Sequence, residues 1–388
     1  MIAVDTYIEI GNTDIELIDG DRGKNYPHQN ELRQEGDCVF LSANNVTTDG
    51  FKFDNVVYIT AEKDRALRNG KIQRGDIVIT TRGTVGNVAY YNQQIPYDNI
   101  RINSGMLIVR CHEQIKSEFL YYVLRGVEFQ RQIKQIQTGT AQPQLPKSHF
   151  IKMKIIVPTI DVQEKIAKIL RTIDEKIESN KCINENLYEQ MLSIFNNARR
   201  TSAWNKHKLG DVLIFFDNLR KPLSSIQREK MAHIYPYYGA ASIVDYVEDY
   251  LFDGTYILIS EDGANVIDSF GHPLTQYTYE KFWVNNHAHI VKGSNGYSEA
   301  LVYAMLGTLN MQSIVTGAAQ PKINQANLRN FEAVLPESEE AQVLSELLNP
   351  MLQQMLHHDQ ENEKLSELRD ILLPQLMSGA LDVSAIDL

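Results

Sequence analysis

The 388-residue sequence has few cysteines and no long apolar run. Its three cysteines, Cys38, Cys111 and Cys182, are odd in number and far apart, so we expect neither a disulfide framework nor a zinc cluster. We interpret them as buried or incidental thiols of a reducing cytoplasm. No run of about 18 apolar residues is present, which argues against a membrane span. The stretch Met1–Thr6 lacks the basic and apolar regions of a secretory signal.

Positive charge is also in short supply. The chain has 38 Lys and Arg against 49 Asp and Glu, which gives a net charge of −11. This balance argues against a nonspecific polyanion binder, because neutralising phosphates requires clustered Lys and Arg. It does not exclude a DNA-binding protein whose basic residues gather on one face.

Recognisable catalytic signatures are missing as well. The sequence has no P-loop, no Asn-Pro-Pro-Tyr-type methyltransferase motif and no Gly-rich cofactor fingerprint. We therefore expect a non-catalytic chain that holds no cofactor and no metal of its own.

What the sequence does contain is a duplication. The string Thr138–Pro143 (TGTAQP) returns as Thr316–Pro321 (TGAAQP), with an offset of 178 residues between the two glutamines (320−142). The prolines that follow, Pro158 and Pro336, keep the same offset (336−158=178). A fixed internal offset is the sequence signature of a duplicated structural unit.

The duplication divides the chain into two globular domains, 1–158 and 200–336, each followed by a long helix, 159–199 and 337–380. Short β-branched runs bounded by Gly, Asn or Asp predict strands of a mixed or antiparallel sheet. In the first domain these runs are residues 7–11, 38–41, 56–59, 76–80, 88–91 and 106–109, and an apolar stripe predicts a helix over 117–135. We therefore predict an α+β fold with an internal pseudo-two-fold repeat.

Both long helices carry a heptad pattern, which predicts a coiled-coil seam. The seven-residue positions in the first helix are Ile166, Ile173, Asn180, Leu187 and Ile194, with Ile169 and Ile183 as companions three residues later. In the second helix they are Leu344, Met351, His358, Leu365 and Leu372, with Leu348, Met355 and Leu376 as companions. At ~1.5 Å per residue each helix is on the order of 50 Å long, too long for one small domain. An antiparallel pair related by a two-fold would bring the polar residues Asn180 and His358 together, unless each reaches solvent.

Two loops occupy matching places in the two domains. Arg82–Gly86 follows one predicted strand, and Arg82 could reach a phosphate or a guanine edge. On that motif alone a plain hairpin turn is favoured. Glu261–Val266 stands at the same place in the second domain with different charge and sequence. A shared frame with divergent loops is what two recognition units with different targets would show.

The most enzyme-like stretch is Asn286–His289. His287 and His289, two residues apart on a strand, could hold a metal ion, with Glu261 and Asp262 as further candidate ligands. The matching first-domain positions are Gly105 and Leu107. We favour surface or groove-lining histidines over a metal site.

These features together resemble the specificity (S) subunits of type I restriction-modification systems. The residues that carry the resemblance are the two Gln-Pro strings, the exits Ile155–Pro158 and Ala333–Pro336, Gln163–Ile166 at the start of the first long helix, and the tail Leu368–Gly379. The resemblance covers nearly the whole chain. Glu339–Gln342 in the second half departs from Val162–Lys165 in the first.

The resemblance implies two target recognition domains, each reading one half of a split double-stranded DNA sequence. It also implies helices that act as a spacer and as docking sites for two methyltransferase (M) subunits, with restriction/translocase (R) subunits added for cleavage. S-adenosylmethionine, ATP and Mg would then bind the partner subunits. From loop position and chemistry, our candidate DNA contacts are Arg82, Gln142, Lys147, Arg220, Lys221, Gln320 and Lys322. The alternatives are a metal-dependent enzyme using His287 and His289, or a scaffold whose domains bind protein.

Overall fold

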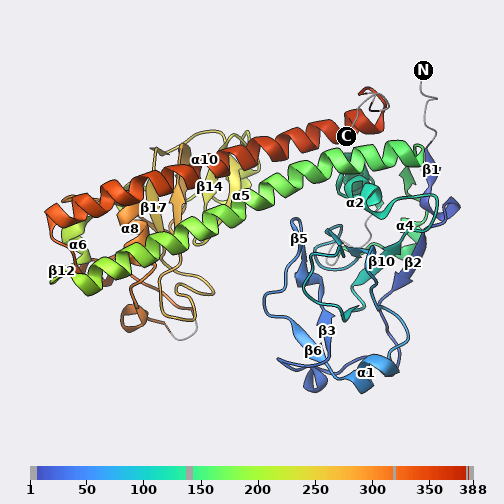
Figure 1. The fold of residues 1–388 in the computed structure, drawn as a ribbon, viewed down its shortest axis with the longest axis horizontal. Coiled ribbons are helices and arrows are strands. Elements are labelled where there is room, and N and C mark those ends of the chain that lie inside the picture. The colour runs from blue at the N-terminus through green and yellow to red at the C-terminus, as the bar shows by residue number, and fades with distance from the viewer. Residues whose placement is uncertain (1–6, 137–142, 318–319, 382, 384–388) are drawn as a thin grey trace. The chain divides into compact units, whose positions relative to one another are not determined.

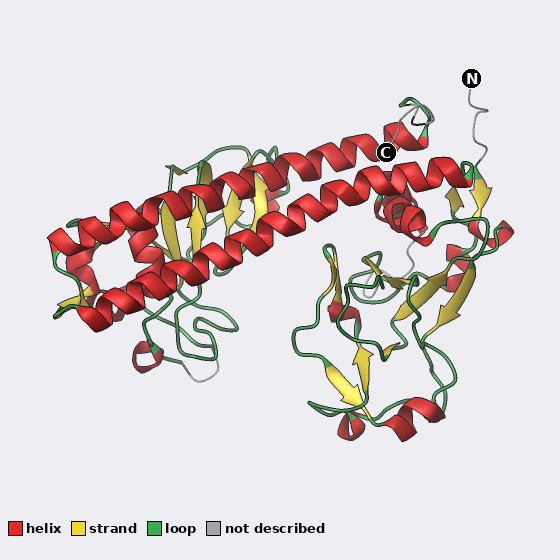
Figure 2. Ribbon diagram, in the orientation of Figure 1, coloured by secondary structure: helices red, strands yellow, loops and turns green. Residues whose placement is uncertain are grey.

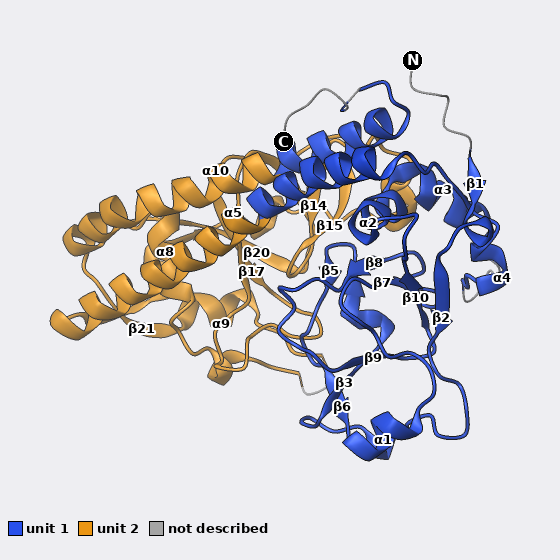
Figure 3. Cartoon of the chain, turned by 45° about the vertical axis from the view of Figure 1, so that its right-hand side comes forward, with its two compact units in different colours: residues 1–177, 363–388 blue, residues 178–362 orange. Residues whose placement is uncertain are grey.

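The computed structural model describes residues 7–136, 143–317, 320–381 and 383. The element order repeats, as the sequence predicts: a set of strands and short helices leads into a long helix, twice (Figure 1). The chain divides into two compact units. Unit 1 comprises residues 1–177 and 363–388, and unit 2 comprises residues 178–362 (Figure 3). Each unit therefore contains one globular part and portions of both long helices.

Unit 1 is built on a four-stranded antiparallel sheet in the order β2 (Glu16–Asp19), β10 (Met106–Arg110), β7 (Ile77–Thr80), β8 (Val88–Tyr90). A second sheet has the order β6 (Val57–Ile59), β3 (Cys38–Leu41), β9 (Ile100–Ile102), and the β3–β9 pair is parallel. Two short pairs complete the strands: β1 (Ile8–Glu9) with β11 (Lys154–Ile155), and β4 (Val46–Thr47) with β5 (Gly50–Phe51). The helices are α1 (Ala61–Ala66), α2 (Ser117–Arg125), α3 (Val127–Ile136), α4 (Lys147–Phe150) and the first part of α5 (Ile160–Thr201).

Unit 2 repeats this topology. Its main sheet has the order β13 (Leu213–Phe215), β20 (Ala288–Gly293), β17 (Tyr256–Ser260), β18 (Thr275–Thr278). The second sheet has the order β15 (Ile243–Val247), β14 (Tyr235–Tyr238), β19 (Lys281–Val284), β16 (Phe252–Asp253), again with one parallel pair, β14–β19. The pair β12 (Asn205–Lys208) with β21 (Glu332–Leu335) matches β1 with β11. The helices are α6 (Leu209–Val212), α7 (Ser225–Arg228), α8 (Glu299–Leu306), α9 (Gln325–Asn330) and most of α10 (Ser338–Met377).

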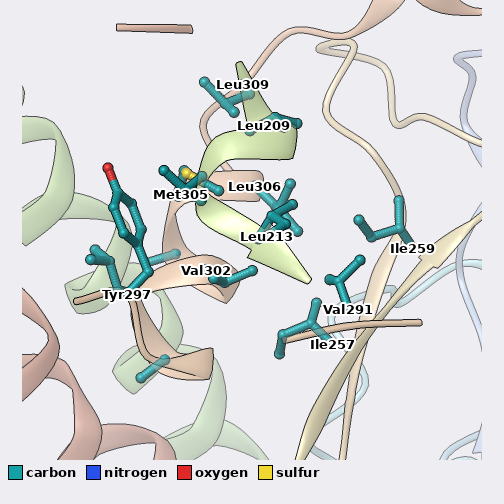
Figure 4. Packing of buried hydrophobic residues seen from close by; sticks show 14 of the residues in the cluster. Leu209, Leu213, Ile257, Ile259, Val291, Tyr297, Val302, Met305, Leu306 and Leu309 are labelled. Carbon is teal, nitrogen blue, oxygen red and sulfur yellow. The ribbon is translucent and has the colours of Figure 1, made fainter. Parts of the chain in front are cut away.

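Each core forms where one short helix packs on the main sheet. In unit 2, Val302, Met305 and Leu306 of α8 face Ile257 and Ile259 of β17, and all five side chains are buried (Figure 4). The β-branched runs form strands here because their alternate side chains pack between the sheet and the helix. Burying a side chain of this size stabilises the fold by about 1.5–3 kcal/mol.

The long helices belong to these cores. In unit 1 the core includes Ile166 and Leu170 of α5 and Leu373 of α10. In unit 2 it includes Phe195 of α5 and Leu344 of α10. Each globular part is therefore packed against both long helices of its unit.

The helix predicted over 117–135 is interrupted. It splits at Gly126 into α2 and α3, because the backbone of Gly126 is extended (φ −63°, ψ 147°). A Cβ at Gly126 would lie 2.7 Å from Leu373 Cδ2 of α10, and one at Gly307, after α8, would lie 2.2 Å from Tyr188 Oη of α5. Glycine at both places lets a long helix approach closely.

The predicted antiparallel pairing of the long helices is observed within each unit. Four cross-helix hydrogen bonds join Asp174 with Arg369, Asn180 with Asn362, Asn184 with His358, and Ser202 with Glu340. The two residue numbers of these pairs add to 543, 542, 542 and 542. A near-constant total is the mark of two helices running in opposite directions. The two helices run without interruption over Ile160–Thr201 and Ser338–Met377 (Figure 2).

Residues at the predicted seam positions are buried or partly buried. They are Ile166, Ile173, Asn180, Leu187, Leu344, Met351, His358 and Leu365. The predicted companions in the first helix are wrong. The buried companions lie four residues later rather than three, at Leu170, Ile177, Asn184 and Met191. Ile183 is exposed and Ile169 is only partly buried. Residues three and four positions apart lie on nearly the same helix face. Because Ile169 and Ile183 fit the apolar pattern, the sequence did not identify the polar residue Asn184 as a seam position.

A polar layer crosses the seam inside unit 2, but its hydrogen bonds are not those predicted. Asn180 Nδ2 donates to Asn362 Oδ1 (2.9 Å) and Glu361 Oε2 (2.7 Å), whereas His358 Nδ1 and Asn184 Oδ1 lie 2.8 Å apart. The offset of 178 relates Asn180 to His358 and Asn184 to Asn362. The duplication therefore relates the Asn180–Asn362 pair to the Asn184–His358 pair. In each pair, the partner lies one helical turn away from the residue that the sequence predicted.

Among the described residues, no helix is both long enough and apolar enough to cross a membrane. The division into the four segments 1–158, 159–199, 200–336 and 337–380 stays a prediction.

Candidate nucleic-acid interface

Three segments meet at one end of the main sheet in unit 1. They are the loop after β7, the start of β10 and the chain after the first Gln-Pro string. Thr81 and Arg82 donate their backbone N–H to the Gly105 carbonyl (2.8 and 3.2 Å), and Leu145 donates to the Thr81 carbonyl (3.0 Å). Arg82 and Gln144 form an isolated β-bridge. The β7–β8 connection is also the hairpin turn that the motif favoured.

Unit 2 has the same arrangement with different side chains. Glu261 donates its N–H to the His287 carbonyl (2.9 Å), and Ile323 donates to the Glu261 carbonyl (2.8 Å). Asp262 and Lys322 form the matching bridge. We call these places the strand-end surfaces: Arg22, Arg82, Gly105 and Gln144 in unit 1, and Asp262, His287 and Lys322 in unit 2.

The second Gln-Pro string closes a tight loop beside this surface. Thr316 and Lys322 exchange two backbone hydrogen bonds of 2.8 Å, and Thr316 Oγ1 also donates to the Lys322 carbonyl. Gly317 has φ +84°, and a Cβ there would lie 2.3 Å from the Gln320 carbonyl oxygen. The Thr and Gly of the string are therefore structural, and Gln320 is left exposed. Gln142, in the first copy, lies outside the described residues.

Behind the unit 2 surface lies an ion cluster of Asp217, Arg220, Glu261 and His289. His289 is fully buried. Its Nδ1 lies 2.6 Å from Asp217 Oδ2 and its Nε2 lies 2.8 Å from the Ile323 carbonyl oxygen. Arg220 Nη1 donates to Glu261 Oε2 (2.6 Å) and to the Ala288 carbonyl (2.8 Å). The cluster joins the loop after β13 to the ends of β17 and β20.

The ion cluster holds both carboxylates ionised. Burial of Asp217 works against its charge, but the hydrogen bond and charge of His289 outweigh burial and lower the pKa of Asp217. Burial of Glu261 is likewise outweighed by hydrogen bonds from Arg220 and Lys322, so the pKa of Glu261 is also lowered. The acids behind the unit 2 surface are thus neutralised by the protein itself.

The arrangement argues against the metal site considered from the sequence. In the described part of the chain, the group with metal-binding geometry is Asp217, Glu261 and His289, without His287. Both ring nitrogens of His289 are already engaged, Nδ1 with Asp217 and Nε2 with the Ile323 carbonyl oxygen, so neither is free to bind an ion. The Arg220 guanidinium already supplies the cation at Glu261. His287 instead bonds Asp262 through Nδ1.

The first unit has an arginine that the sequence reading missed. Asp19 and Arg22 form an i,i+3 ion pair (3.6 Å), as Asp217 and Arg220 do (3.7 Å). Arg22 donates to the Ser104 carbonyl (3.3 Å), next to Gly105. Its side chain is 52% exposed, against 15% for Arg220. The matching Asp-x-x-Arg spacing in the two halves was the available signal.

The remaining predicted DNA contacts lie in different environments. Arg82 and Lys221 are exposed, and the backbone carbonyl of Lys221 accepts a hydrogen bond from Trp283 Nε1. Lys147 donates to the Leu17 carbonyl (2.6 Å), and Lys322 pairs with Glu261 (3.0 Å) while remaining 45% exposed. Arg220 is largely buried in the ion cluster, which gives it a positioning role.

A family model fits this duplicated architecture. The model described as "Type I restriction modification DNA specificity domain" matches residues 13–189 and, a second time, residues 201–367. The chain belongs to this family. The first match begins in the globular part of unit 1, and the second begins at Thr201, the last residue of α5. Each match ends inside a long helix, α5 or α10. The repeated frame is therefore the family's own domain, present twice.

Individual relatives agree with the family assignment. The specificity subunit of the type I restriction enzyme MjaIX of Methanocaldococcus jannaschii is 22% identical over 351 residues, which cover 81% of this chain and 79% of the relative. The HindI specificity subunit of Haemophilus influenzae is 24% identical over 183 residues, 45% of this chain and 38% of the relative.

A solved structure shares the fold. The crystal structure of a type I restriction-modification S subunit from M. genitalium aligns with a TM-score of 0.52, 17% identity and 96% coverage of both chains. The family's two-domain, two-helix architecture thus extends over nearly all of this chain.

Proposed function

We propose that this chain is the DNA-specificity subunit of a type I restriction-modification complex, and that each unit reads one half of a bipartite target. The observation that carries the proposal is the duplicated frame with different chemistry at the same place. Both strand-end surfaces use the same backbone hydrogen bonds, but one presents arginines and the other a His-Asp-Lys set. Two readers with separate specificities need this combination of shared scaffold and divergent side chains.

The distribution of charge supports DNA binding despite the net charge of −11. In unit 2 the acids nearest the surface, Asp217 and Glu261, are neutralised by Arg220 and His289. Lys221 and Lys322 remain exposed there, and Arg22 and Arg82 are exposed in unit 1. These cations would hold phosphates and read base edges in the major groove. The glutamines Gln142 and Gln320, shared by both halves, suit a common backbone contact. Lys147 would add a backbone contact in unit 1 alone, because its equivalent at the offset of 178 is Gln325.

The long helices would set the gap between half-sites. Two half-sites on one face of DNA lie about 34 Å apart, one helical turn, and each helix is on the order of 50 Å long. The same helices would dock two methyltransferase subunits, to which restriction subunits are added. Val343 and Leu347 on α10 are 65% and 54% exposed, an apolar pair suited to a partner. Their equivalents on α5 are Lys165 and Ile169, so the two docking surfaces differ.

Chemistry would reside on the partners in this scheme. S-adenosylmethionine, ATP and Mg would bind the methyltransferase and restriction subunits, and this chain would contribute recognition without catalysis. A subunit acting on DNA in this way would work in the cytoplasm.

A chimera tests the proposal. Residues 1–177 and 363–388 form one compact unit, so both segments are exchanged together for those of a relative, and the chimera is expressed with its methyltransferase. Methylome sequencing should show one half of the recognised sequence changed and the other half and the gap retained. If both halves changed, or neither did, the two-reader proposal would fail.

The other two functions predict different results. A metal-dependent enzyme would contain a stoichiometric metal ion that the H289A substitution removes. Under our proposal, elemental analysis of the purified protein should find no such ion. A protein-binding scaffold would leave DNA methylation specificity unchanged in every chimera.

A further inference from the structure

The strand-end surface is where the two units are most alike in backbone and least alike in chemistry. The backbone hydrogen bonds equate Arg82 with Asp262, and Gln144 with Lys322. They equate Gly105 with His287 in the same way. Arginine, glycine and glutamine in one reader thus become aspartate, histidine and lysine in the other.

In unit 1 this surface presents the guanidinium of Arg82. Arg82 is exposed, and its side chain makes no ion pair or hydrogen bond with any residue in the described part of the chain. Gly105 lies directly beside it, since a Cβ at Gly105 would be 3.8 Å from Arg82 Cβ. The backbone of Arg82 is fixed by Gly105 and by the bridge to Gln144. The position is therefore rigid while the side chain is available.

In unit 2 the same surface presents an oriented imidazole. His287 is 47% exposed, and its Nδ1 bonds Asp262 Oδ1. Asp262 is 16% exposed and lies 3.9 Å from Lys322 Nζ. A carboxylate only accepts hydrogen bonds, so Nδ1 donates, and in the neutral ring the lone pair lies on Nε2. Nε2 thus becomes the acceptor that the ring offers to an outside group.

We propose that side chains of the two strand-end surfaces determine the base preference of each half-site: Arg82 reads a guanine, and His287, positioned by Asp262, reads an exocyclic amino group of adenine or cytosine. The inference rests on the proposed function. Arginine forms a bidentate pair with guanine O6 and N7, and an acceptor pairs with adenine N6 or cytosine N4 in the major groove. Opposite hydrogen-bonding character on the two matching surfaces gives the two half-sites different sequences from one scaffold.

The test uses the complex with its methyltransferase subunits and a DNA library randomised over both half-sites. For R82A we expect the guanine preference at one position of one half-site to fall about tenfold to a hundredfold. The other half-site and the gap should be unchanged, and R82K should retain part of the preference. H287A should abolish one base preference in the other half-site only. D262A should do the same, whereas D262N, which keeps an acceptor oxygen for Nδ1–H, should recover most of it.

Controls separate base reading from other effects. R131A removes an exposed arginine that pairs with Glu128 on α3 of the same unit, and it should leave the selected sequences unchanged. Thermal unfolding of every variant shows whether it is folded. The inference is overturned if R82A lowers affinity equally for all sequences, as a phosphate contact would, or if R82A and H287A alter the same half-site. A wild-type complex that selected no bipartite sequence would instead refute the proposed function.

Discussion

At the scale of residues, two histidines two positions apart take opposite roles: His289 lies in β20, whereas His287 lies in the turn before it. His289 is fully buried between Asp217 and a backbone carbonyl, whereas His287 is half-exposed on the strand-end surface. The sequence predicted both histidines on one strand, where two-residue spacing would place their side chains on the same face. That prediction is wrong for His287, because β20 begins at Ala288. The ion cluster around His289 joins three segments of unit 2 behind the strand-end surface.

The ion cluster should make unit 2 sensitive to acid. The folded-state pKa of Glu261 lies below its ordinary value of 4.5, so its carboxylate stabilises the fold above pH 4.5. That stabilisation is lost as pH falls below this value, with a slope of up to about 1.4 kcal/mol per pH unit. E261Q should therefore flatten the dependence of unfolding free energy on pH in this window, as measured by denaturant titration. The control is E332Q, an exposed glutamate on β21, and a slope unaltered in E261Q would contradict the prediction.

The Gln-Pro loop should not tolerate a side chain at its glycine. G317A combines φ +84° with a Cβ 2.3 Å from the Gln320 carbonyl, so we expect a loss of about 1–3 kcal/mol in unfolding free energy. G254A is the matched control: Gly254 has φ +105° but nothing within 4 Å of an added Cβ. If both variants lost equal thermal stability, the close approach between the added Cβ and the Gln320 carbonyl oxygen would not explain the loss in G317A.

At the scale of elements, the seam between the long helices depends on a polar layer in unit 2. Asn184 donates to Asp359 Oδ1 (3.0 Å) and to the Met355 carbonyl (3.1 Å), and it also bonds His358. Tyr277 of β18 donates to Asp359 Oδ2 (2.6 Å) and so connects the globular part to the seam. Burial raises the pKa of Asp359, and the hydrogen bonds from Tyr277 and Asn184 limit the rise.

Removing the amide should destabilise this layer. N184A removes the amide that bonds His358 Nδ1 and leaves Asp359 with the hydrogen bond from Tyr277, and we expect unfolding free energy to fall by about 1–3 kcal/mol. E185A, on the exposed face of the same helix, should change it by less than about 0.5 kcal/mol. A double-mutant cycle of N184A with H358A should show a coupling energy of at least about 0.5 kcal/mol. Additive losses would mean that the two side chains do not depend on each other.

At the scale of the whole molecule, the duplication joins two readers to two long helices. We expect one heptad inserted into each helix to lengthen the gap between half-sites and leave the half-sites themselves unchanged. Seven residues add about 10 Å, which corresponds to roughly three base pairs at ~3.4 Å each. Methylome sequencing of cells that carry the double insertion gives the new gap. An insertion that leaves the gap as it was would rule out a spacer role.

The sequence by itself determined the duplication, the long antiparallel helices and part of the strands, but it missed others, among them β2 and β9 of unit 1. These features follow from short-range periodicity and from a repeated string, both of which are written along the chain. It also indicated Arg82 and Lys322 as candidate DNA contacts, because loop residues between strands tend to be exposed.

Only the tertiary structure decided which polar residues are buried and which face outward. It moved the companions of the first seam by one residue, paired Asn184 with His358, and placed Arg220 in the ion cluster. It also brought Arg82 beside Gly105, and His287 beside Asp262. Such pairings join segments far apart in the chain, and burial depends on the packing of all of them. Local residue patterns carry no record of that packing.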